Sequence, residues 1–165
     1  MQRRAPKKEQ EQLFRDWVTK HQGILLHIAR GFAAEPDQDD LVQDMLLALW
    51  HAVPKFRGES AESTFIYRVA QNVALTWKRG RSRQPVMDEF DEADHQQPPP
   101  SMKFERSAQL YAAIRKLPEL DRSLLLMHLD EMPYRQIAET LGLSESNVGA
   151  RLTRLRQRLA RLIKE

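Results

Sequence analysis

The residues with the clearest chemistry are arginines that recur at helical spacing near the C-terminal end of the sequence. Wound at 100° per residue, they form one basic stripe beside a stripe of valine and leucine, and its members are Arg151, Arg154, Arg158 and Arg161. No acidic residue occurs within residues 146–164. A helix that is merely solvated usually interleaves both signs of charge. The stripe therefore favours contacts with phosphates and with the acceptor edge of guanine.

A short turn precedes this stripe and indicates how it is presented. Within residues 134–148, Gly142 can take the left-handed conformation of a tight turn, and Ser144 can cap the helix that follows. This order predicts a helix-turn-helix. Its second helix begins with polar residues suited to phosphates and base edges in a major groove. The candidate DNA contacts are Ser144, Ser146, Asn147, Arg151 and Arg154.

Residue patterns that support catalysis or metal binding are weak or missing in the sequence. Because there is no cysteine, disulfides, thiolate zinc sites and cysteine nucleophiles are all excluded. An acidic cluster could ligate a hard cation, but helix capping and a protein contact explain it better, and its members are Asp37, Asp39, Asp40 and Asp44. We therefore predict a protein that is not an enzyme, with no catalytic residue, metal or cofactor.

Charge divides the sequence into three parts. The 165 residues include 26 Lys and Arg against 23 Asp and Glu, so the formal net charge is +3. The excess acid is concentrated in a stretch that also contains three consecutive prolines, a composition typical of a linker. We predict two small basic domains, 1–83 and 104–165, joined by a flexible acidic linker at 84–103.

Apolar residues recur at intervals of three and four in both domains, which predicts an all-α fold with no strands. In the first domain we expect one or two helices over Phe14–Phe32, then a helix capped by Asp37 or Asp39 and closed by Pro54. A third should run from about Ser63 to Arg79 and end at Gly80. In the second domain, Pro118 should stop one helix and Pro133 should lie in the first turn of another.

Both domains resemble one known family, in the family's own order. The segment LPELDRSLLLMHLDEMPYRQIAETLGLSESNVGARLTRLRQRL resembles the C-terminal promoter-binding domain of the extracytoplasmic-function (ECF) sigma factors of bacterial RNA polymerase. In the N-terminal domain, residues 40–50 resemble the family's polymerase-binding helix. The stretch KFRGESAESTFIYRVAQN resembles its promoter-melting loop and helix.

The resemblance implies a sigma factor that binds core RNA polymerase, directs it to promoter DNA and helps melt it. The implied polymerase contacts are Asp40, Leu41, Val42, Gln43, Asp44, Leu47 and Trp50. The implied contacts with the minus-ten element are Phe56, Arg57, Gly58, Glu59, Ser60, Asn72, Arg79 and Arg81. The candidate contacts of the helix-turn-helix would recognise the minus-thirty-five element.

Two other classes of protein stay open at this point. A stand-alone helix-turn-helix regulator would bind duplex DNA as a dimer without polymerase, and a nucleic-acid enzyme that uses the acidic cluster would need a metal. The family also implies an anti-sigma factor as a partner. We expect no membrane insertion, because no stretch approaches about 18 consecutive apolar residues. The N-terminus has no apolar run typical of a signal peptide, so we expect a cytoplasmic protein.

Overall fold

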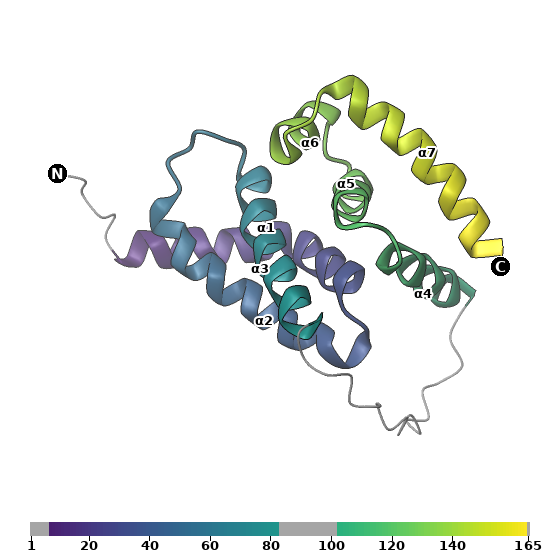
Figure 1. The fold of residues 1–165 in the computed structure, drawn as a ribbon. Helices are drawn as coiled ribbons and strands as arrows, with labels where there is room; N and C mark the ends of the chain where they lie inside the picture. The colour runs from purple at the N-terminus through teal and green to yellow at the C-terminus, as the bar shows by residue number, and fades with distance from the viewer. Residues whose placement is uncertain (1–6, 83–101, 165) are drawn as a thin grey trace.

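The computed structural model of the protein describes residues 7–82 and 102–164, which form seven α-helices and one short 3-10 helix (Figure 1). No strand occurs in these two ranges, so the prediction of an all-α fold is confirmed. We call α1–α3 with the 3-10 helix η1 the N-terminal half, and α4–α7 the C-terminal half. The elements are α1 (Lys7–Phe32), α2 (Glu35–Ala52), η1 (Val53–Lys55), α3 (Glu62–Ser82), α4 (Met102–Arg115), α5 (Glu119–Leu129), α6 (Tyr134–Leu141) and α7 (Glu145–Lys164).

The N-terminal half is a three-helix unit in which α1, α2 and α3 each pack against the other two. Their apolar stripes meet in a core whose largest fully buried side chains are Trp17, Ile28, Leu41, Met45, Leu49, Ile66 and Tyr67. One non-helical residue, His21, kinks α1 with φ −118° and ψ 17°. The kink explains why the sequence is compatible with either one or two helices in this stretch.

The C-terminal half contains the predicted helix-turn-helix, formed by α6 and α7. Gly142 ends α6 in the left-handed conformation, with φ 69° and ψ 35°. Ser144 then caps α7, since its Oγ accepts a hydrogen bond of 3.1 Å from the backbone N–H of Asn147. Both turn predictions are confirmed, and α5 supports the motif by packing against α6 and α7.

Two predicted helix boundaries differ from the structure. Neither Asp37 nor Asp39 caps α2, which begins at Glu35 after Ala34 and has a proline in its first turn. Acidic side chains in the first turn of a helix are stabilised by the positive end of the helix dipole. The acidic residues therefore lie inside α2 and do not precede it. Gly80 does not end α3, which continues to Ser82.

The predicted linker 84–103 lies mostly outside the described residues. Its last two positions, Met102 and Lys103, belong to α4.

The two halves lie against each other. Figure 1 shows α5 and α6 beside the helices of the N-terminal half, and contacts join α1 to α4 and α5, and α3 to α6. No helix in the described part of the chain is both long and apolar enough to cross a membrane.

Two glycines of the helix-turn-helix should respond in opposite ways to replacement by alanine. Gly142→Ala should lower the free energy of unfolding by about 1–2 kcal/mol, because its left-handed backbone disfavours a Cβ. Gly149→Ala should raise it by up to about 1 kcal/mol, because Gly149 is helical. Its new Cβ would meet Tyr134 at an ordinary 3.6 Å. Urea denaturation of the full chain measures both, and equal signs would contradict this account.

Candidate nucleic-acid and polymerase interfaces

The first turn of α7 presents a polar surface. Ser144 and Ser146 are exposed, and their hydroxyls lie 3.2 Å apart, whereas Asn147 is half-buried. The three side chains lie where unpaired backbone N–H groups and the positive end of the helix dipole favour anions. The turn therefore brings the polar part of the predicted minus-thirty-five site together.

The arginine stripe of α7 is divided between two environments. Arg154 and Arg158 are exposed, but Arg151 is half-buried and its Nη1 donates a 3.0 Å hydrogen bond to Oδ1 of Asp121. Asp121 lies in the first turn of α5 and is only 17% exposed, so water screens this ion pair less than one at the surface. These four side chains and Leu155 line an open hollow of about 260 Å³.

Arg151 therefore differs from the simple DNA contact that the sequence suggested. Its guanidinium is oriented by a carboxylate on a neighbouring helix, 30 positions away in the sequence. The arginines with exposed side chains beside it are Arg154 and Arg158. The basic stripe contains Arg158, although it was not among the candidate DNA contacts.

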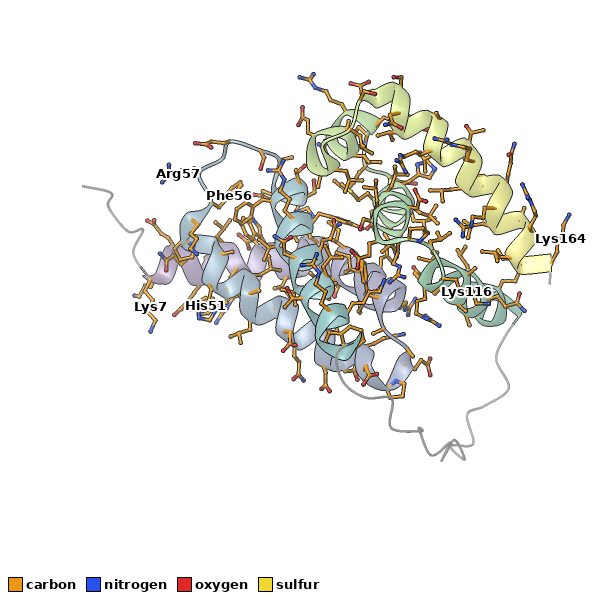
Figure 2. All side chains as sticks on the ribbon, in the orientation of Figure 1. Lys7, His51, Phe56, Arg57, Lys116 and Lys164 are labelled. Carbon is orange, nitrogen blue, oxygen red and sulfur yellow. The ribbon has the colours of Figure 1, made fainter. Side chains whose placement is uncertain are left out.

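The predicted minus-ten loop leaves the N-terminal half next to an aromatic cluster. Figure 2 labels Phe56 and Arg57 at the start of this loop. The Phe56 ring packs against Trp17 and Phe65, with centroid distances of 5.1 and 5.0 Å. Phe56 therefore anchors the loop in the core and its ring is not free to stack on a base. The exposed residues of the loop are Arg57, Gly58 and Glu59, and Ser60 is half-buried.

Asn72 lies elsewhere along the same helix. It is ten positions beyond Glu62, about 15 Å along α3 at about 1.5 Å per residue. It lines a hollow of about 330 Å³ between α2 and α3, together with Asp44, Val73, Thr76 and Trp77. The loop and Asn72 therefore lie at two points along α3. Farther along, Arg79 is exposed, and Arg81 lies in the last turn with no described side chain.

The predicted polymerase helix has one buried face and one exposed face. Leu41 is fully buried in the core and Val42 packs against it. Leu41 is therefore not available to a partner, which corrects the sequence interpretation. Trp50 is half-buried and makes an edge contact with Phe14 at 5.3 Å between ring centroids. The exposed face consists of Asp40, Gln43, Asp44 and Leu47, and Leu47 is 59% exposed.

A second polar cluster, which the sequence analysis missed, lies on another side of α7. Arg156 Nη2 approaches His128 Nε2 at 3.1 Å, and the His128 and Tyr134 rings meet edge to face. Burial, followed by the nearby charge of Arg156, lowers the pKa of His128 below its ordinary value. A neutral imidazole can accept the arginine hydrogen bond. The three residues of this polar cluster come from three different helices, so no local sequence pattern signals it.

Among the described residues, no three His, Asp or Glu side chains gather into a group that could hold a metal ion. The acidic residues of α2 are spread along the helix, and all of them are exposed except Asp37, which is half-buried. The geometry gives two separate surfaces: a polar and basic one on α7, and an acidic and apolar one on α2.

Comparisons with known proteins assign both halves to one family. Residues 17–84 match the family Sigma-70 region 2, and residues 107–159 match Sigma-70, region 4. The ECF RNA polymerase sigma-E factor of Escherichia coli (strain K12) is 27% identical over 164 residues, covering 91% of this chain and 86% of that protein. The chain belongs to the ECF sigma factors. The sigma-E factor of Haemophilus influenzae is 26% identical over 154 residues, covering 85% of this chain and 82% of the relative.

Two solved structures share the fold of this chain. CnrH in complex with the cytosolic domain of CnrY has a TM-score of 0.67 at 26% identity, covering 93% of this chain and 89% of that chain. The sigma factor RpoE in complex with the anti-sigma factor NepR from Bartonella quintana has a TM-score of 0.64 at 24% identity, covering 91% and 98%. At this identity, the second structure shows only that the two proteins share a fold.

An ECF sigma factor binds core RNA polymerase and directs it to promoters, and its family acts in transcription initiation. A stand-alone regulator is not favoured, because both sigma regions are present and in order.

The pairing of Arg151 with Asp121 should matter for promoter discrimination. The chain should bind a duplex that carries the preferred upstream element more tightly than a scrambled duplex. Asp121→Ala should lower the ratio of these two affinities about fivefold. This corresponds to about 1 kcal/mol, the lower end of what one well-placed arginine contributes. Binding titrations at two salt concentrations measure it.

The matched control is Asp16→Ala, which removes an exposed carboxylate from α1 in the other half. It should leave the ratio unchanged. An unchanged ratio for Asp121→Ala as well would show that the ion pair does not position Arg151 for recognition.

Proposed function

We propose that the two halves of this sigma factor act as separate domains with distinct recognition tasks. The N-terminal half binds core polymerase through the exposed face of α2 and recognises the minus-ten element through loop residues 57–60 and α3. The C-terminal half recognises the minus-thirty-five element as duplex through α7. The observation that carries this proposal is that α7 presents polar caps and exposed arginines while α2 presents acids and an exposed leucine.

The physical difference between the two DNA sites supports the division. Arginines on an exposed helix suit the acceptor-rich major groove of duplex DNA. An amide beside an apolar hollow, such as Asn72 between α2 and α3, suits the edge and face of a base that has left the stack. The first site should therefore act in initial binding and the second in melting.

Further properties belong to the same proposal. The chain acts without catalysis of its own, in the cytoplasm, where core polymerase and DNA are found. CnrH is seen with the cytosolic domain of CnrY, and the Bartonella quintana sigma factor with the anti-sigma factor NepR. We infer that an anti-sigma factor also holds this chain. Affinity purification of the chain from its own cells tests this, and recovery of polymerase with no other stoichiometric protein would argue against it.

Single substitutions at the two DNA sites should separate binding from melting. Arg154→Ala should weaken binding of the holoenzyme to duplex promoter, at a cost of about 1–3 kcal/mol, and leave a pre-opened bubble template nearly unaffected. Asn72→Ala should spare the closed complex and impair open-complex formation. Binding to duplex and bubble templates, with permanganate footprinting of melted bases, measures both steps. Equal losses at both steps for both variants would refute the division.

The acidic face of α2 should carry polymerase binding. Reversing charge with Asp40→Lys and Asp44→Lys should reduce co-purification with core polymerase at least tenfold, because both carboxylates are exposed and neither is required by the core. Duplex binding by the C-terminal half of the same variant should not fall. The control is Asp16→Lys, an exposed acid on α1. Unchanged assembly of the double variant would count against the α2 surface.

A further inference from the structure

The minus-ten loop, residues 57–60, makes few contacts of its own. Among the described residues, no hydrogen bond or ion pair holds Arg57, Gly58 or Glu59, and all three are exposed. Gly58 takes the left-handed conformation with φ 74°, and open space surrounds the position of its Cβ. Ordering such a loop around a base costs conformational entropy, and fixing its ends lowers that cost. Base reading by this loop therefore depends on how its two ends are held.

A short stretch of α1 contacts both ends of the loop. At the first end, the Phe56 ring packs against Trp17, which is only 1% exposed. At the second end, Glu62 begins α3, and its Oε2 lies 3.5 Å from His21 Nε2 and 3.9 Å from Lys20 Nζ. The three α1 residues fall within five consecutive positions, slightly more than one helical turn. One part of α1 therefore sets the position of both ends.

The two cations beside the Glu62 carboxylate are not equivalent. The side chain of Lys20 is 71% exposed, whereas that of His21 is 15% exposed, so water and salt screen the lysine pair more strongly. His21 Nε2 is buried and has no hydrogen-bond partner among the described residues. A movement of about 0.5 Å would bring it into ordinary hydrogen-bond range of the carboxylate. His21 is therefore the main partner of Glu62.

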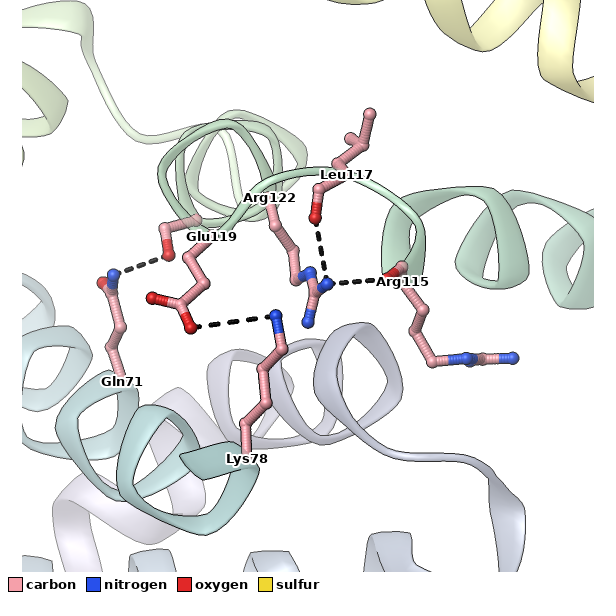
Figure 3. A network of polar contacts seen from close by, with 7 residues as sticks. Gln71, Lys78, Arg115, Leu117, Glu119 and Arg122 are labelled. Carbon is pink, nitrogen blue, oxygen red and sulfur yellow. Dashed lines mark hydrogen bonds and ion pairs between the residues drawn. The ribbon is translucent and has the colours of Figure 1, made fainter. Parts of the chain in front are cut away.

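The later part of α3 is fixed by other contacts. Gln71 Nε2 donates a 2.5 Å hydrogen bond to Ser123 Oγ, and Lys78 Nζ lies 3.7 Å from Glu119 Oε1. Figure 3 shows both contacts bridging from α3 to α5. Asn72 lies between these two anchored positions of α3. A change at the first residue of α3 should therefore move the loop and leave Asn72 in place.

We propose that residues 17–21 of α1 form a platform that positions the minus-ten loop for base reading. Trp17 holds the first end through the Phe56 ring. His21 holds the second end through the Glu62 carboxylate. These are positioning residues, because they act through the loop and not through contact with DNA. The inference rests on the proposed reading of the minus-ten element by this loop.

Base reading by the loop can be measured without melting. Holoenzyme made with the full chain is titrated with a single-stranded oligonucleotide that carries the preferred minus-ten element, and with a scrambled one. Glu62→Gln should lower the ratio of the two affinities at least threefold, because the amide keeps the shape of the side chain and loses its charge. His21→Asn should lower the ratio as well, since its shorter side chain cannot reach the carboxylate.

The matched control is Glu119→Gln. It removes the other ion pair of α3, and the Glu119 side chain is 41% exposed against 37% for Glu62. The ratio should stay at the wild-type value in this variant, because the Glu119 pair lies far along α3 from the loop. A loss equal to that of Glu62→Gln would overturn the local positioning role.

An exchange of charges separates positioning from direct contact with DNA. Glu62→Lys alone should lower the ratio at least threefold, because it places like charges together. Adding His21→Glu should recover at least half of the lost ratio, since an ion pair forms again with its signs reversed. Direct reading of DNA by Glu62 would give no recovery, and that result would overturn the positioning role.

A dye on the loop tests the platform without DNA. The protein has no cysteine, so Glu59→Cys places a dye at an exposed loop position. In time-resolved anisotropy of the full chain, Glu62→Gln should at least double the amplitude of the fast component, because a released loop end moves more freely. Glu119→Gln should leave that amplitude unchanged. An unchanged amplitude in the Glu62→Gln background would overturn the proposal.

The proposed function and this inference fail in different ways. Wild-type holoenzyme that binds both oligonucleotides equally would overturn base reading by the loop, and the platform with it. Full wild-type discrimination by Glu62→Gln and His21→Asn would overturn the platform and leave the proposed function intact. Co-purification with core polymerase shows which variants are folded. Glu62→Gln, at a half-exposed position, decides the case if a His21 variant does not fold.

Discussion

Each helix of this protein must bury one apolar stripe, and this constraint determines where its functional side chains lie. In α7 the buried stripe consists of Val148, Leu152, Leu155 and Leu159. Each fully buried leucine contributes about 1.5–3 kcal/mol. Rotating α7 by one residue would expose that stripe and bury guanidinium groups, which is costly for unpaired charges. The core therefore holds Arg154 and Arg158 outward, at exposed positions.

The same constraint produces the acidic surface of α2. Leu41, Met45 and Leu49 face the core, which leaves Asp40, Asp44 and Leu47 on the opposite side. An exposed leucine one turn beyond a carboxylate is unfavourable in water but suits a partner that covers the apolar side chain and pairs with the acids.

Much of this arrangement could be predicted from the sequence, because helical period, turn glycine and capping serine are local signals. The helix-turn-helix and its basic stripe follow from residues within one short segment. The roles inferred for Leu41 and Phe56 are wrong because a motif assigns a role to a whole run of residues, whereas some side chains of that run pack into the core. The ion pair of Arg151 with Asp121 joins residues that are distant in the chain, so only the tertiary structure reveals it.

Promoter specificity is the property that this chain gives to core RNA polymerase. Transcription from a library of randomised promoters, with purified core polymerase and the full chain, measures it most directly. We expect start sites that appear only when the chain is added and that share two sequence elements about 25 base pairs apart, as the names of the two elements imply. Start sites that do not depend on the chain, together with tight binding of the chain alone to a palindromic duplex, would contradict it.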